Sequence, residues 1–295
     1  MAEFALDGTV SSPSPGIAGL KRGGPRLWAG AALVGVLMLI ALLAPLLAPH
    51  DPVEQDLMSA QLPPAWLSGG EPAYWFGTDS LGRCVLSRLI YSARTAVAVA
   101  LIAASLAAAI GVAFGLIAGS FGGWVDQVTS RLIDVWMAFP PVLLSIVLAA
   151  VIGAGLTSVI AAIVVVDWTR FARVVRAETM VQLRRDYAAA ARVIGLSRGQ
   201  VLRLEILPNL VPLVVTLLSV EMGIAILVEV ILSFVGISVT GDTPTWGGMI
   251  AEGRTIVYQA PWIMALPIGC IIVSVIGFNL LGDGLRLALD PVQRR

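Results

Sequence analysis

Charged side chains are scarce in this sequence. They make up 13% of its 295 residues, whereas hydrophobic residues make up 58%. A soluble domain carries roughly 25% charged residues, so this chain has too little polar surface to keep a globule dissolved. The formal net charge is zero, which gives no global field to attract nucleic acid as a partner. A membrane environment accounts for both features, and the composition therefore predicts an integral membrane protein.

Residues that usually bind metals or carry catalysis are also rare. The only histidine is His50, and the two cysteines, Cys84 and Cys270, are far apart in the sequence. This excludes most histidine-based metal sites and any serine–histidine arrangement not built on His50. The single lysine, Lys21, is followed by Arg22, so a phosphate-binding loop of the GxxxxGK[ST] type is absent. We expect no catalytic, cofactor or metal site and no ATP hydrolysis by this chain.

Long uncharged segments predict an all-α membrane protein with six transmembrane helices. A hydrocarbon core of about 30 Å needs about 20 apolar residues in a helix. The expected spans lie at about 27–48, 95–120, 132–152, 156–176, 208–236 and 261–281. The uncharged stretch 135–166 is too long for one crossing, and Gly153 to Gly155 mark a turn within it. Pro140 and Pro141 are expected to open or kink the third helix.

These spans divide the chain into a membrane domain, 27–291, and two short tails, 1–26 and 292–295. The apolar core of the first span is longer than the 7–15 residues of a typical signal peptide, so we interpret it as an uncleaved helix. The connecting segments comprise two external loops, 49–94 and 237–260, and a cytoplasmic loop, 177–207. Both external loops are rich in Pro, Gly and Trp and are expected to form a cap around a pore mouth.

Basic residues predict the orientation of the spans, because they accumulate on the cytoplasmic side. Of the 19 Lys and Arg residues, 15 fall on the side of the two termini and 4 on the opposite side. The termini and the arginine-rich loop are therefore expected in the cytoplasm.

The loop between the fourth and fifth spans is the most informative stretch of the sequence. From Met180 it reads MVQLRRDYAAAARVIGLSRGQVLRLEILP. Asp186 is expected to cap a short helix, and Gly195 to end it. One apolar face of this helix is predicted from the helical spacing of Tyr187, Ala190, Ala191 and Ile194. Four arginines surround it: Arg184, Arg185, Arg192 and Arg198.

A small-residue face with a basic rim fits docking into a groove of another protein that carries acidic residues. It fits equally well an interfacial helix that lies on anionic lipid headgroups. The spacing alone does not separate these two interpretations.

The stretch from Ala190 to Gly195, followed by Leu207 and Pro208, resembles the EAA loop of ABC importer permeases. Ala189 stands where that family usually has Glu. The resemblance implies a coupling helix that inserts into a cleft of the cytoplasmic ATPase. The residues expected to couple this chain to the ATPase are Tyr187, Ala189, Ala190, Ala191, Ile194, Gly195, Arg184 and Arg198.

Two further stretches resemble the dipeptide and oligopeptide permeases of this class. The first is GTDSLGR, which places Gly77, Thr78, Asp79, Leu81, Gly82 and Arg83 on that family's signature loop. The second is the tail segment FNLLGDGLR, at 278–286, with Leu289, Asp290 and Pro291. We expect the signature loop to play a structural role in the cap, with direct contact to substrate as the alternative.

The resemblance covers about residues 27–291 and implies a type I ABC importer permease in a bacterial inner membrane. It implies a homologous second permease, two ATPase subunits or domains and an external binding protein as partners, in addition to membrane lipid. The implied substrates are di- and oligopeptides, with glutathione, nickel chelates or another small solute as alternatives. A secondary transporter driven by an ion gradient is the rival of another class.

Charged residues inside the predicted spans are the other candidates for function. Glu221 and Glu229 lie eight residues apart in the fifth span, where an acidic side chain is costly unless it faces protein or water. They are candidates for lining the translocation path, with burial at the interface with the sister subunit as the alternative. Asp167 and Arg170 are expected to pair at i, i+3, and Asp134 is expected to pair with Arg131 in the same way.

Overall fold

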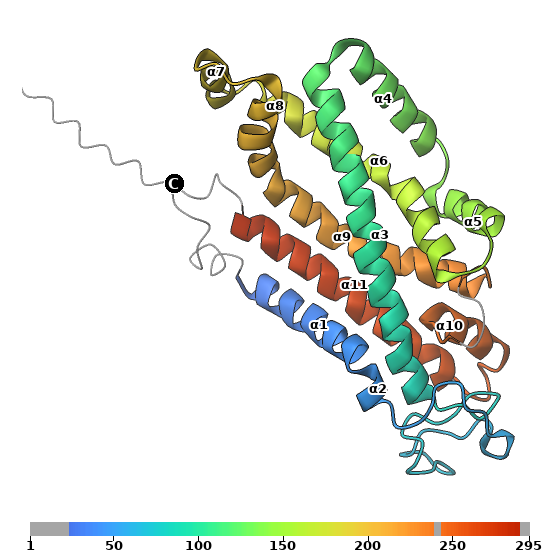
Figure 1. Cartoon of the computed structure of the whole chain (residues 1–295). Coiled ribbons are helices and arrows are strands. Elements are labelled where there is room, and N and C mark those ends of the chain that lie inside the picture. Colours follow the sequence, from blue (N-terminus) through green and yellow to red (C-terminus); the bar gives the residue numbers. More distant parts are fainter. Residues whose placement is uncertain (1–23, 239–242, 290–295) are drawn as a thin grey trace, which may run out of the picture.

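The computed structural model describes residues 24–238 and 243–289, and every extended regular element in these two ranges is a helix (Figure 1). The expected tail 292–295, most of the tail 1–26 and the motif residues Asp290 and Pro291 lie outside the described residues. The helices are, in chain order, α1 (Gly24–Leu42), α2 (Ala44–Leu47), η2 (Leu57–Ser59), α3 (Val85–Phe121), α4 (Gly123–Met137), α5 (Pro141–Ile152), α6 (Leu156–Gln182), α7 (Asp186–Val193), α8 (Arg198–Val201), η3 (Leu202–Ile206), α9 (Leu207–Phe234), α10 (Trp246–Thr255) and α11 (Trp262–Leu289).

Four helical segments are long and apolar enough to cross a membrane. These are α1, α3, the continuous run from α8 to the end of α9, and α11. The pair α4 and α5 makes a fifth only if the two helices count as one span, because they are bent by 87° at their junction. The all-helical fold is as predicted. Helix α6 is long but is not among these segments, since its second half carries several charged residues.

The expected third span, 132–152, is not one straight helix. Helix α4 ends at Met137, and α5 begins at Pro141 with Pro140 as its N-cap. Pro140 cannot donate a helical hydrogen bond, and it disfavours the helical conformation of the residue before it. The prediction that the two prolines open or kink this segment is confirmed. The turn predicted from Gly153 to Gly155 also separates α5 from α6.

The most extensive helix contact joins α3 to α6. It is close because Gly111, Gly115 and Gly119 recur every fourth residue on the face of α3 that meets α6. A Cβ atom at Gly115 would lie 2.8 Å from the carbonyl oxygen of Ala172, and one at Gly119 would lie 2.8 Å from that of Arg176. Small residues at this spacing allow two backbones to approach in a membrane, so α3 and α6 form the closely packed centre of the fold.

Helix α1 packs along α11 in the same manner. A Cβ atom at Gly30 would lie 2.3 Å from the backbone nitrogen of Leu281, and one at Gly284 would lie 2.4 Å from the Cα of Leu27. Helix α11 also packs on α9, which in turn packs on α3. The largest apolar core lies between these four helices and α10.

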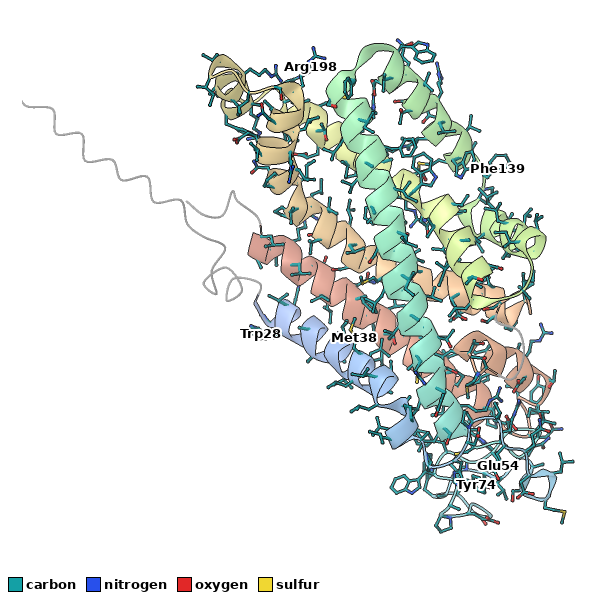
Figure 2. The ribbon with its side chains drawn as sticks, in the orientation of Figure 1. Trp28, Met38, Glu54, Tyr74, Phe139 and Arg198 are labelled. Carbon is teal, nitrogen blue, oxygen red and sulfur yellow. The ribbon has the colours of Figure 1, made fainter. Side chains whose placement is uncertain are left out.

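The functional candidates lie at opposite ends of this bundle. Helices α7 and α8 project at one end, and the long loop between α2 and α3 covers the other end together with α10 (Figure 1). Figure 2 shows Arg198 at the first end and Glu54 and Tyr74 at the second. The fold therefore separates the predicted coupling loop from the predicted cap by the length of the bundle.

Candidate functional site

The loop predicted to couple the chain to an ATPase consists of α7, α8 and η3, a π-helical turn that leads directly into α9. Ser197 caps α8: its hydroxyl accepts from the backbone nitrogen of Gln200 at 3.4 Å, and Oε1 of Gln200 accepts from the backbone nitrogen of Ser197 at 2.8 Å. This capping box fixes the direction in which the chain leaves α7. The loop is therefore a folded unit with a defined orientation on the bundle.

Helix α7 turns one alanine-rich face inward. Ala188 is 0% exposed and Ala191 is 4% exposed. Both pack in a cluster with Val175 of α6, Ile206 of η3 and Leu210 of α9. The sequence placed Ala191 on the docking face, and the structure corrects this, because Ala191 contacts its own chain. The predicted face is divided in the structure, since Ala191 and part of Tyr187 face the bundle whereas Ala190 and Ile194 are exposed.

The opposite side of α7 is apolar and exposed. Val193 is 86% exposed and Ile194 is 79% exposed, and Ala189 and Ala190 lie beside them on the surface. Large aliphatic side chains exposed together at the tip of a loop are typical of a surface that another protein or a membrane covers. Val193 belongs to this face although the sequence analysis did not select it. Its position four residues after Ala189 was the available signal.

The end of α7 follows the prediction, and its start does not. The backbone nitrogen of Gly195 donates to the carbonyl of Arg192 at 3.0 Å, and that of Leu196 donates to Ala191 at 3.1 Å. This pair of bonds is a Schellman motif, which needs the positive φ of 91° at Gly195. Asp186 is the first residue of the helix and not its cap, since the preceding residue occupies the cap position without a side-chain hydrogen bond.

Tyr187 lies at the boundary between the two faces of α7. Its side chain is partly buried against the inward cluster, and its hydroxyl donates to Oε1 of Gln182 at 2.6 Å. Burial raises the pKa of the Tyr187 hydroxyl above its usual value. Arg184 and Arg198 are exposed at the rim. Tyr187 therefore stabilises the loop from its inward side, whereas both arginine side chains lie on the surface of the loop.

At the opposite end, the signature loop is held by a buried ionic cluster. Asp79 is 1% exposed and accepts hydrogen bonds from the backbone nitrogens of Leu81 and Arg83, at 2.9 and 3.0 Å. The Nε of Arg83 donates to the same carboxylate at 2.7 Å, and the guanidinium of Arg88 also binds it. Both arginines reach Glu252 of α10, Arg83 at 2.9 Å and Arg88 at 2.6 Å.

The cluster holds two arginines and two carboxylates, so its formal charge is zero. It ties three segments together: the signature loop, the first turn of α3 and α10. Because Asp79, Arg83 and Arg88 are all buried, this geometry favours the structural role expected for the signature loop over direct contact with substrate. Glu252 was not selected from the sequence. It lies 169 residues from Arg83, and no local pattern links the two.

The glycines of the signature loop are required by close approach to the preceding part of the cap, which contains η2. Gly77 and Gly82 both have a φ of 74°. A Cβ atom at Gly77 would lie 2.2 Å from the carbonyl oxygen of Leu62, and one at Gly82 would lie 1.7 Å from that of Asp56. Thr78 is 0% exposed, and its hydroxyl accepts from the backbone nitrogen of Leu62 at 2.8 Å. The motif residues thus hold the signature loop against the segment that precedes it in the cap.

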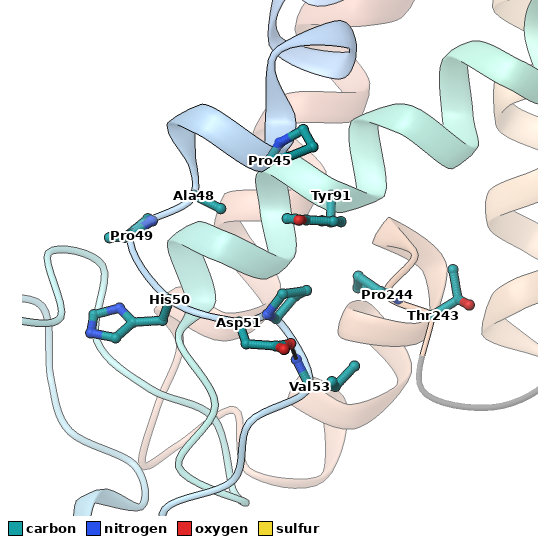
Figure 3. Close-up of a pocket in the computed structure, with 10 residues that line it drawn as sticks. Pro45, Ala48, Pro49, His50, Asp51, Val53, Tyr91, Thr243 and Pro244 are labelled. Carbon is teal, nitrogen blue, oxygen red and sulfur yellow. Dashed lines mark hydrogen bonds between the residues drawn. The ribbon is translucent and has the colours of Figure 1, made fainter.

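An open hollow of about 700 Å³ lies beside this cap (Figure 3). Its walls are the segment from Pro45 to Val53, Tyr91 of α3 and the residues just before α10, Thr243 and Pro244. The His50 ring extends away from the hollow and stacks on Tyr74 with 4.8 Å between ring centroids. The hollow is large enough for a small ligand, since ligand pockets range over about 300–1,000 Å³.

The two acidic residues of α9 are buried within this chain. Glu221 is 4% exposed, and its Oε2 lies 3.5 Å from Nη1 of Arg170. Arg170 also approaches Asp167, at 3.9 Å, so the expected i, i+3 pair is present and Glu221 joins it. Glu229 is 1% exposed and accepts from the hydroxyl of Ser233. Neither glutamate opens on a surface of this chain, which speaks against the predicted lining of the translocation path.

The other expected pair, between Asp134 and Arg131, is not formed. Asp134 instead pairs with Arg173 of α6 at 3.0 Å, and Arg176 pairs with Asp126 of α4. The bend between α4 and α5 lays α4 against α6, so its carboxylates meet arginines from another helix. Sequence spacing alone favoured the local partner.

Taken together, these features define a polytopic helical membrane protein with a folded helical loop at one end and a cap held by buried ion pairs at the other. Residues 111–295 match the family model described as the binding-protein-dependent transport system inner membrane component. Residues 25–64 match the N-terminal transmembrane domain of oligopeptide transport permease C.

Curated relatives cover most of the chain. It is 42% identical to the dipeptide transport system permease protein DppC of Haemophilus influenzae over 89% of both chains. It is 37% identical to the di/tripeptide transport system permease protein DppC of Pseudomonas aeruginosa over 88% of both. It is 38% identical to the glutathione transport system permease protein GsiD of Shigella dysenteriae over 88% of this chain and 84% of that protein.

The chain therefore belongs to the family of binding-protein-dependent transport system inner membrane components. This membership confirms the resemblance drawn from the sequence motifs. It makes the chain a multi-pass membrane component of a transport system and not an enzyme in its own right.

Proposed function

We propose that this chain is one of two permease subunits of an ATP-driven importer and forms half of the translocation pathway for di- and oligopeptides. The two permeases work with two ATPase subunits or domains, one of which binds the cytoplasmic loop of this chain, and an external binding protein delivers the peptide to the capped end. The exposed apolar face of α7, with Val193 and Ile194 at its centre, carries this proposal. The names of the relatives, dipeptide and di/tripeptide permeases, support peptides as the substrate.

The orientation belongs to the same proposal. Six crossings with both termini in the cytoplasm put α7 on the ATP side and the cap outside. Helix α6 is then a crossing whose charged second half is compensated by ion pairs, and the bent pair of α4 and α5 supplies another. The ion pairs of Arg173 and Arg176 with α4 support this arrangement, because paired charges are tolerated where isolated ones are not.

Glutathione is the second candidate substrate, because permeases named for glutathione are 38% identical to the chain. The hollow beside the cap is where a delivered peptide would first meet this chain. Glutathione is itself a tripeptide, so the two candidates share a backbone and a free carboxylate. An uptake assay with both substrates and the cognate binding protein separates them.

The docking role is tested by a charge placed on the outward face of α7. Ile194→Glu would bury a carboxylate in the ATPase groove, at a cost of at least a few kcal/mol, which is roughly a 100-fold loss of affinity. In proteoliposomes that hold the complete importer, peptide uptake and ATP hydrolysis should fall together. The variant should still insert in the membrane, since Ile194 makes no buried contact in its own chain.

Leu204→Glu is the matched control, because Leu204 is a 56% exposed leucine of the same loop that lies on η3 instead of α7. It should retain uptake. Normal uptake by Ile194→Glu, with the ATPase still bound, would show that α7 is not the coupling helix. Uptake by the purified chain alone, without ATP, would instead favour the secondary transporter.

A further inference from the structure

A second feature of the cytoplasmic loop lies behind the docking face. A pocket of about 260 Å³ opens where the end of α3 meets α7 and α8. Its lining includes Ser120, Phe121, Arg192, Arg198, Val201 and Leu202. It is thus a concave site between three helices and not part of the convex surface formed by Val193 and Ile194.

The charge of this pocket is entirely positive. Two guanidinium groups line it, and no carboxylate does. Among residues 24–238 and 243–289, neither Arg192 nor Arg198 forms an ion pair. Arg192 donates one hydrogen bond from Nη2 to the carbonyl of Leu183 at 3.2 Å, which leaves most of its donors free. Two like charges around one cavity repel each other, so an anion between them is favoured.

The apolar part of the pocket indicates what kind of anion fits. Val201 is buried in its wall, and Phe121 is 58% exposed at its edge. Trp124, three residues further on, is 77% exposed. Exposed aromatic rings of this kind gather at the level of lipid headgroups. The pocket therefore combines an exposed aromatic edge with two guanidinium groups that can donate to a phosphate.

We propose that this pocket binds the phosphate of an anionic phospholipid, with Arg192 and Arg198 donating to its oxygens and Phe121 against its glycerol. Anionic lipids are concentrated in the cytoplasmic leaflet, so the choice of a lipid as the source rests on the proposed orientation. The two interpretations of the loop then apply to different surfaces: the outward face of α7 meets the ATPase, and the pocket behind it holds a lipid.

The test uses the full chain alone, delipidated in a neutral detergent, and measures bound lipid by native mass spectrometry. We expect one site that prefers phosphatidylglycerol over phosphatidylcholine. Each arginine near an anionic lipid contributes about a fivefold change in affinity, so Arg192→Gln with Arg198→Gln should weaken phosphatidylglycerol binding roughly 30-fold. Arg184→Gln with Arg185→Gln removes the same charge from the same loop outside the pocket and should retain tight binding.

A third variant blocks the pocket and leaves its charge unchanged. A Cβ atom at Gly199 has no neighbour within 4 Å, so Gly199→Leu can occupy the pocket without straining the fold. Its phosphatidylglycerol binding should fall although both arginines remain. Glycerol phosphate and inorganic phosphate, titrated separately, distinguish a headgroup site from a site for a free anion.

Three results would overturn the proposal. Equal losses of phosphatidylglycerol binding in the two double variants would mean that the overall charge of the loop attracts the lipid and that the pocket is not a specific site. Full binding by Gly199→Leu would place the lipid elsewhere. Saturation by inorganic phosphate that phosphatidylglycerol does not displace would assign the pocket to a free anion. None of these measurements involves the ATPase or uptake, so their failure is distinct from failure of the proposed importer.

Discussion

Replacement of Asp79 by asparagine is the sharpest perturbation of the cap. The asparagine side chain would keep an oxygen for the backbone nitrogens of Leu81 and Arg83, and its size would match that of the aspartate. The Oδ2 atom that accepts from Arg83 and Arg88 would become an amide nitrogen, which cannot accept, so the negative charge and these two hydrogen bonds would be lost together. The substitution therefore separates the contacts with the two arginines from the turn that the same side chain supports.

The burial of the cluster sets the size of the expected loss of stability in Asp79→Asn. Asp79 is 1% exposed, and the side chains of its two arginine partners are 8% and 5% exposed. Removal of one partner from a buried ion pair costs about 3–5 kcal/mol. Glu252 remains to hold both arginines, so we expect a value of about 3 kcal/mol, at the lower end of that range. Glu252→Gln should cost less, about 1 kcal/mol, because its side chain is 35% exposed and water screens its charge.

The reactivity of the Cys84 thiol measures this loss of stability in the cap. Cys84 follows Arg83 in the chain, is 2% exposed and is a free thiol. With Cys270→Ser as the background, the rate at which Cys84 reacts with a thiol reagent measures how often the cap opens. A loss of about 3 kcal/mol corresponds to roughly 100-fold faster labelling in Asp79→Asn. Glu54→Gln, which removes an exposed acid of the same loop, should label at the original rate.

This reasoning would be refuted if Cys84 in Asp79→Asn reacted as slowly as in the original protein and thermal unfolding were also unchanged. In that case the backbone bonds and glycine turns would hold the cap, and the ion pairs would contribute little. A larger effect in Glu252→Gln than in Asp79→Asn would also contradict it, since the exposed partner would then dominate the buried one.

The packing, the titration and the orientation each carry a further prediction. Gly115→Leu should lower stability by about 1–3 kcal/mol in thermal unfolding, because its Cβ would lie 2.8 Å from the backbone of α6, whereas Gly35→Leu, with open space around its Cβ, should have little effect. Burial raises the pKa of Tyr187, so its contribution to stability should be present below about pH 10, the usual tyrosine pKa, and be lost as the pH rises through the folded-state pKa; an ultraviolet difference titration against Tyr187→Phe measures this. In intact cells, an impermeant thiol reagent should label Gln61→Cys in the cap but not Arg295→Cys.

The sequence predicted those parts of the fold that depend on local chemistry. Proline and glycine interrupt helices through their own backbone chemistry, as Pro140 and Gly153 do here. The turn at Gly195 needs a positive φ, which residues other than glycine adopt less easily. The motifs also identified the family. By contrast, the 87° bend between α4 and α5 depends on how α4 packs on α6, which no local signal expresses.

The sites show the same division between local and long-range information. Helical periodicity found α7, but the choice between Ala191 and Val193 as the outward residue depends on where Val175 and Ile206 lie. Likewise, the pairing of Arg83 with Glu252 spans most of the chain. Glutamates in an apolar span suggested a polar path, whereas the burial of Glu229 depends on how α9 packs in the bundle, which is visible only in three dimensions.

Helix α9 shows how the two ends are mechanically related. It starts from the π-helical turn η3 and contains Pro212 in its second turn, and both features weaken the helical ladder next to the coupling loop. The far half of α9 packs closely on α10, because a Cβ atom at Gly247 of α10 would lie 2.2 Å from the carbonyl oxygen of Val230 in α9. We therefore expect a displacement of α7 to bend α9 near Pro212 before it moves α10. A more closely packed connection runs from Ala191 through Val175 into α6 and, across the glycine contact, into α3, whose first turn carries Arg88 of the cap cluster.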